Sequence, residues 1–209
     1  MLCDSLIFDM DGTLWDAVDS YIKIWNDTFE QLGIDAERVD RKRLMGTMGQ
    51  TLEQILTQLV PNLTDKETFL KVLDANETAM MPVLGGKLYP GVLDTLRQLG
   101  QKIPLFLVSN CGSYGLKNFL HFTGMENIFR DTRSHGENGL SKAMNIKQIV
   151  DLYSLQHAVY VGDTQTDCNS AHQAGIPMIW AAYGFGNVTD PDAVIHSFPE
   201  LLQTIQTAQ

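Results

Sequence analysis

The stretch LIFDMDGT, at residues 6–13, is the first structural signal in the chain. Its first three residues are apolar and the run stops at Asp9, which predicts a short buried strand. Asp11 and Gly12 follow as a turn signal. Because so short a strand is not stable in isolation, it has to join a sheet formed by segments farther along the chain.

Beyond residue 91, apolar strands alternate with amphipathic helices. Near-continuous apolar runs predict strands at 103–110, 158–163 and 177–184, and helical spacing predicts helices at 92–100, 114–124, 145–153, 166–175 and 198–206. This alternation is typical of a parallel sheet that is covered by helices on both faces. We therefore predict an α/β fold with a doubly wound parallel-sheet core.

The segment between the first strand and this core has a different character. Apolar residues recur at helical spacing in two stretches, as Ile22, Trp25, Phe29 and Leu32, and as Leu52, Ile55, Leu56 and Leu59. Gly33 is expected to end the first of these helices. We expect an all-helical cap at residues 15–85, inserted into a core of residues 1–14 and 86–209, with hinges near 13–16 and 82–90.

The negative net charge of the chain argues against some classes of binding partner. The 209 residues suit one large domain or one domain with a modest insertion. The 15 basic and 25 acidic residues give a net charge of -10, which opposes a sequence-independent grip on nucleic acid or on an anionic membrane surface. The negative net charge does not exclude a small anionic substrate, because a metal ion or a lysine can make the electrostatic potential positive within one pocket.

Cysteine usage and the N-terminal sequence predict a cytoplasmic protein. The three cysteines show no CxxC spacing, which argues against a disulfide framework and against structural zinc. The acid Asp4 stands where a signal peptide would carry positive charge, and no apolar run reaches the length of a membrane span. The oligomeric state cannot be deduced from the sequence.

Polar side chains gather at the ends of the predicted strands. They are Asp9 and Asp11 after the first strand, Ser109 and Asn110 after the second, and Asp163 and Asp167 after the third, with Lys142 at the start of a helix between the last two. Because ligands of doubly wound sheets bind beyond the carboxyl ends of the strands, we expect these side chains to converge.

This set of side chains suits phosphoryl chemistry. Neighbouring carboxylates raise one another's pKa, and a divalent cation relieves the repulsion; a few oxygen ligands suit Mg²⁺, which shares its shell with substrate phosphate. The lysine and the serine hydroxyl suit the other phosphate oxygens. One carboxylate can attack phosphorus, and a second, two residues on, can protonate the leaving oxygen and later activate water.

The four segments DMDGTL (9–14), VSN (108–110), LSK (140–142) and GDTQTD (162–167) resemble, in order, the four motifs of the haloacid dehalogenase-like hydrolase superfamily. The helical block lies where that superfamily inserts its helical cap. The chain is similar to its phosphoglycolate phosphatase-like branch. The resemblance implies a Rossmann-like core with a helical cap.

The resemblance also implies a role for each matching residue. Asp9 matches the nucleophile that becomes aspartyl-phosphate, and Asp11 the general acid and base. The implied metal set is Asp9, Asp11 (through its backbone carbonyl), Asp163 and, through the metal waters, Asp167; the implied phosphate-binding set is Ser109, Asn110 and Lys142. The predicted function is Mg²⁺-dependent hydrolysis of a small phosphorylated metabolite, a phosphoglycolate-like phosphomonoester.

Other interpretations stay open at this point. The acids and Ser109 could be turn or helix-cap residues, and Lys147 is a rival to Lys142. The basic run at 41–43 could steer substrate or form a solvated face, the loop at 46–51 could approach the substrate or only connect helices, and Trp15 could line the pocket or anchor the hinge. The alternative functions are a phosphosugar mutase and a catalytically silent metabolite-binding module.

Overall fold

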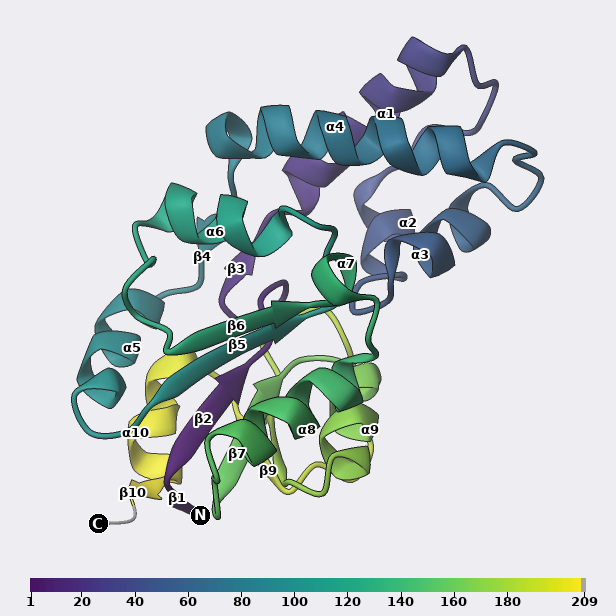
Figure 1. Cartoon of the computed structure of the whole chain (residues 1–209). Helices are drawn as coiled ribbons and strands as arrows, with labels where there is room; N and C mark the ends of the chain where they lie inside the picture. The colour runs from purple at the N-terminus through teal and green to yellow at the C-terminus, as the bar shows by residue number, and fades with distance from the viewer. Residues whose placement is uncertain (208–209) are drawn as a thin grey trace.

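A six-stranded, wholly parallel sheet forms the centre of the protein in the computed structural model, which describes residues 1–207 (Figure 1). In spatial order its strands are β6 (Asp131–Ser134), β5 (Leu105–Ser109), β2 (Ser5–Phe8), β7 (Ala158–Gly162), β8 (Met178–Ala181) and β9 (Ala193–Ile195). Strand β2 pairs with both β5 and β7. Asp9 therefore leaves the sheet from its middle, between the ends of these two strands.

Helices cover both faces of the sheet. They are α5 (Val92–Gly100), α6 (Gly115–Thr123), α7 (His135–Asn138), α8 (Lys142–Leu152), α9 (Gln165–Gln173) and, near the C-terminus, the 3-10 helix η1 (Phe198–Glu200) with α10 (Leu201–Thr204). Alternate residues of β2 enter different hydrophobic clusters: Leu6 and Phe8 join one, and Ile7 joins the other under α8 and α9. This arrangement confirms the predicted doubly wound α/β core.

Four helices form the inserted cap: α1 (Val18–Leu32), α2 (Arg41–Met45), α3 (Leu52–Leu59) and α4 (Lys66–Leu84). In Figure 1 they lie beyond the carboxyl ends of the sheet strands. Gly33 ends α1 in the left-handed conformation, as expected. Trp25, Phe29 and Phe69 pack together and hold α1 against α4.

The two chain segments that join cap and core pair with each other. Strand β3 (Trp15–Asp16) runs antiparallel to β4 (Lys87–Leu88) and forms a short ribbon. The predicted second hinge begins too early, because α4 continues through Pro82 and the Gly85 N–H closes it onto the Met81 carbonyl. The division of the chain at 14/15 and 85/86 stays a prediction.

Some strands and one helix differ from expectation. β6 and β9 were not predicted, and neither was the small parallel pair of β1 (Leu2–Cys3) with β10 (Gln206–Thr207). The helix predicted at 198–206 is only a 3-10 turn and one α-turn, since residues from Gln206 pair with β1. Within residues 1–207, no helix combines the length and apolar character that a bilayer crossing requires.

Candidate active site

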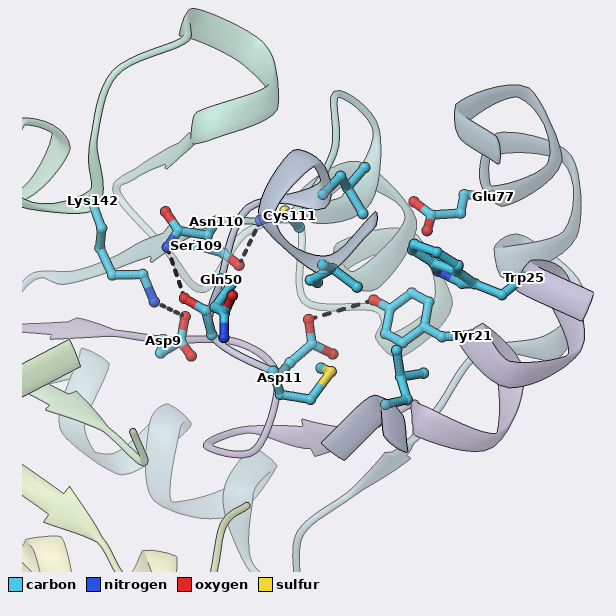
Figure 2. A pocket seen from close by; sticks show the side chains of 15 residues that line it. Asp9, Asp11, Tyr21, Trp25, Gln50, Glu77, Ser109, Asn110, Cys111 and Lys142 are labelled. Atoms are coloured by element: carbon cyan, nitrogen blue, oxygen red, sulfur yellow. Dashed lines mark hydrogen bonds and ion pairs between the residues drawn. The ribbon is translucent and has the colours of Figure 1, made fainter. Parts of the chain in front are cut away.

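A small cavity of about 50 Å³ lies between the carboxyl edge of the sheet and the cap (Figure 2). Core residues Asp9, Asp11, Ser109, Asn110, Cys111 and Lys142 form one side of it. The other side consists of cap residues Tyr21, Trp25, Leu44, Met48, Gly49, Gln50, Leu52, Ile55 and Glu77. All the predicted residues that follow β2 and β5, together with the lysine, thus border one space.

Three buried carboxylates meet beside this cavity. One oxygen each of Asp9, Asp163 and Asp167 lies within 4.8 Å of the others. Lys142, which is 2% exposed, donates to Asp9 Oδ1 at 2.8 Å and to Asp167 Oδ1 at 2.6 Å. The second oxygen of Asp167 accepts from the backbone N–H and hydroxyl of Thr164. The lysine and the turn after β7 thereby fix the acids in one arrangement.

The charges in this cluster do not balance. Burial, and then the charge of Asp167, raise the pKa of Asp9 to about 7, although Lys142 acts in the opposite direction. Burial, followed by Asp167 and Asp9, also raises the pKa of Asp163. Burial disfavours the Lys142 ammonium, but Asp167 and Asp9 outweigh it and hold its pKa well above the ordinary value. One lysine faces three acids, and their oxygen-only set fits a divalent cation such as Mg²⁺.

Asp11 has a separate place. Its carboxylate is outside the cluster of three and accepts from Trp15 Nε1 at 2.9 Å and from the Tyr21 hydroxyl at 3.5 Å. Burial, and then the charge of Asp9, raise its pKa to about 7. A carboxyl group with such a pKa can both give and take a proton near neutral pH. That its backbone carbonyl binds a metal stays a prediction.

Trp15 was expected either to line the pocket or to anchor the hinge, and the structure shows that it does not line the cavity. Its indole is fully buried, orients Asp11 through the Nε1 hydrogen bond, and packs edge-on against Phe119 with ring centroids 4.9 Å apart. It therefore connects the ribbon between cap and core to a residue of the site.

The cap loop at 46–51 touches the core. Asn110 Nδ2 donates to the Gly49 carbonyl at 2.9 Å. Gly49 has φ +83°, and a Cβ there would lie 2.8 Å from Thr164 Oγ1, so glycine permits the close approach. Ser109 Oγ accepts from the Cys111 N–H at 3.2 Å, so it also has a structural contact.

The other basic candidates are engaged elsewhere. Lys147 forms an exposed ion pair with Asp151. Arg41 binds Asp16 and Asp19 on the surface near the ribbon. Arg43 donates to backbone carbonyls, and the run at 41–43 does not border the cavity.

Sequence reasoning missed the loop that holds Asp163. The Phe185 N–H donates to Asp163 Oδ2 at 2.7 Å. A Cβ on Gly12 would lie 2.1 Å from the same oxygen, and one on Gly184 would lie 2.3 Å from Asp163 Cβ. Gly12 and Gly184 thus leave room for this carboxylate, which larger residues would displace.

Glu77 on α4 was missed as well. It is a buried cap acid on the cavity wall, and no sequence motif marks the cap. A signal was nevertheless present. The buried residues of α4 recur every four positions as Phe69, Leu73, Glu77 and Met81, so an acid interrupts an otherwise apolar stripe.

The chain resembles known proteins over almost its whole length. The family model described as haloacid dehalogenase-like hydrolase matches residues 6–181. A phosphoglycolate phosphatase of Synechococcus elongatus is 26% identical over 209 residues, covering 96% of each chain, and one of Rhodobacter capsulatus is 24% identical, covering 94% of this chain and 91% of the relative.

Solved structures share the fold. A predicted phosphoglycolate phosphatase of Haemophilus somnus has a TM-score of 0.85 at 20% identity and covers 97% of each chain. A CbbY variant from Rhodobacter sphaeroides in complex with xylulose 1,5-bisphosphate has a TM-score of 0.82 at 18% identity and covers 95% of this chain and 96% of that one. The family match confirms the resemblance read from the four motifs. The chain belongs to the haloacid dehalogenase-like hydrolase family, and its curated relatives in that family are phosphatases.

Proposed function

We propose that the protein is a Mg²⁺-dependent phosphatase that hydrolyses a small phosphomonoester through an aspartyl-phosphate on Asp9. One observation carries the proposal: Asp9 leaves the middle of the sheet into the cavity, bonded to Lys142 and grouped with Asp163 and Asp167. The names of the curated relatives support the same reaction class.

The first half of the reaction transfers the phosphoryl group to the protein. A carboxylate oxygen of Asp9 attacks phosphorus while the bond from phosphorus to the leaving oxygen breaks. Asp11 donates its proton to that oxygen, so the product leaves as an alcohol. Lys142, Ser109 and Asn110 bind the phosphoryl oxygens and offset the charge that develops on them.

The second half releases phosphate. Asp11, now ionised, takes a proton from a water molecule that attacks the phosphorus, and the bond to Asp9 breaks. Asp9, Asp163 and Asp167, with the Asp11 carbonyl, would hold Mg²⁺ during both halves. When bound, the ion neutralises part of the negative charge of the acids and the phosphate, so that anion can approach anion.

The cap would control access of water. The Asn110–Gly49 hydrogen bond and the Tyr21–Asp11 contact join cap and core across the cavity. Opening the cap would break both, admit water and release product, and closing would restore them.

The test is phosphate release from a panel of small phosphomonoesters, in Mg²⁺ and in EDTA, for the wild type and Asp9→Asn. Asp151→Asn, on the exposed face of α8, is the matched control. We expect metal-dependent release in the wild type and the control and none in Asp9→Asn, with circular dichroism unchanged. An active Asp9→Asn protein, or release that EDTA does not affect, would contradict the proposal.

A further inference from the structure

Glu77 has no partner in the site just described. Its residue is 8% exposed, and Figure 2 shows its carboxylate pointing from α4 toward the cavity that Tyr21 and Trp25 also border. Within residues 1–207 no donor bonds to this carboxylate, although the Glu77 backbone carbonyl accepts from Asn118 Nδ2 at 3.3 Å. A buried acid without a partner is costly, and a ligand group placed beside it would remove the cost.

Within the described residues, the cap side of the cavity carries no cationic side chain. Lys142 is the only cationic side chain on the cavity wall within the described residues, and it is bonded to Asp9 and Asp167. The remaining cap wall around Glu77 is apolar or neutral. A leaving group with a carboxylate would therefore meet Glu77 and Asp11 without a compensating charge.

The same wall suits a cation. Tyr21 and Trp25 present aromatic rings to the cavity, and aromatic rings together with a carboxylate are the groups that bind ammonium ions. Burial, and then the charges of Asp74 and Asp11, raise the pKa of Glu77 to about 8. A positive group beside it would favour the ionised form and gain a short, desolvated ion pair.

We propose that the substrate carries an ammonium group on the leaving-group side of its phosphate ester, and that Glu77 binds this group. The substrate class is a short amino-alcohol phosphomonoester. The inference rests on the proposed phosphatase function and adds what the cap selects. It implies that phosphoglycolate, the substrate after which the relatives are named, is a poor substrate of this protein.

Four esters of nearly equal size test the proposal. They are 2-aminoethyl phosphate, 2-hydroxyethyl phosphate, propyl phosphate and phosphoglycolate, with kcat/KM measured for each in Mg²⁺. The readout is the ratio of kcat/KM for the amine ester to that for propyl phosphate within each protein, because a general loss of activity cancels in it. Glu77→Gln keeps the shape of the side chain and removes its charge. Glu67→Gln, the same substitution at an exposed position in the first turn of α4 and not on the cavity wall, is the matched control.

We expect the amine ester to exceed propyl phosphate by about 10- to 100-fold in the wild type, the range of a hydrogen bond to a charged group. The ratio should fall to near one in Glu77→Gln and stay within about twofold of wild type in Glu67→Gln, since that acid is exposed and not on the cavity wall. Phosphoglycolate should rank last in the wild type.

Three results would overturn the inference. One is a ratio that Glu77→Gln leaves unchanged, and another is phosphoglycolate ranking first. The third is 2-hydroxyethyl phosphate matching the amine ester, which would make Glu77 a neutral hydrogen-bonding group. In all three the esters are still hydrolysed, so the phosphatase function stands. Release from none of the four esters would contradict the ammonium-ester proposal, and the wider phosphomonoester panel with Asp9→Asn would test the phosphatase function separately.

Discussion

The ion pairs of Lys142 should make a large contribution to folding. The ammonium is 2% exposed and donates to two buried carboxylates at 2.8 and 2.6 Å. Lys142→Met keeps most of the side-chain volume and removes the charge, which leaves the acid cluster without any cation. Removing one partner of a buried pair costs about 3–5 kcal/mol, so we expect the free energy of unfolding to fall by that amount in EDTA.

The pH of this experiment follows from the pKa shifts. The folded-state pKa of Lys142 is raised above its ordinary 10.5, so the stability it contributes is fully present at any pH below 10.5. Asp9, with a pKa of about 7 in the wild type, must be ionised for its ion pair with Lys142 to be present, which holds at pH 8. Urea unfolding at pH 8 satisfies both conditions.

Lys147→Met is the matched control, on the same helix. Lys147 pairs with Asp151 on the surface, with side chains 56% and 61% exposed, and such pairs contribute at most about 0.5 kcal/mol. Mg²⁺ should recover part of the loss in Lys142→Met, because a bound cation supplies the missing charge and stabilises the folded state by mass action. Equal losses for the two variants would refute this account of the cluster.

Two further predictions concern Glu77 and Gly12. Burial raises the pKa of Glu77 from 4.5 to about 8, so the folded protein keeps a proton that the unfolded chain releases. The contribution of Glu77 to the free energy of unfolding is therefore fully present below pH 4.5. It declines by at most about 5 kcal/mol as the pH rises to 8. Thermal unfolding of Glu77→Gln and wild type should thus diverge in favour of the variant between pH 5 and pH 9, and a constant difference would argue against a buried acid. Gly12→Ala should lower the free energy of unfolding by more than Gly33→Ala does. Both glycines have a positive φ, so each alanine adds roughly 1 kcal/mol of backbone strain. A methyl group at position 33 enters open space, whereas one at position 12 would displace Asp163. Urea unfolding and phosphate release check this, and equal stability of the two alanine variants would contradict it.

The core could be predicted because its strands carry local signals. β2, β5 and β7 are apolar runs that end in polar residues. Because the carboxyl ends of parallel strands lie at the same edge of a sheet, Asp9, Ser109 and Asp163 could be predicted to lie together there. β6, with the sequence DTRS, is a polar edge strand whose pairing with β5 depends on the rest of the fold. The two-residue strands β3 and β4 are too short for any periodicity to reveal.

Local periodicity predicted the cap helices, but it did not predict the acid that interrupts the apolar face of α4. A helix face that buries Phe69, Leu73 and Met81 would be more stable with another apolar residue at position 77. Glu77 instead lowers the free energy of unfolding at neutral and higher pH. Residues that are unfavourable for folding are expected where a binding site needs the side chain. The two Glu77→Gln experiments are therefore linked. If one substitution both stabilises the protein above pH 7 and removes the preference for an ammonium ester, the stability lost to Glu77 is explained by substrate selection. A gain in stability with selectivity unchanged would leave the acid without a role at the site.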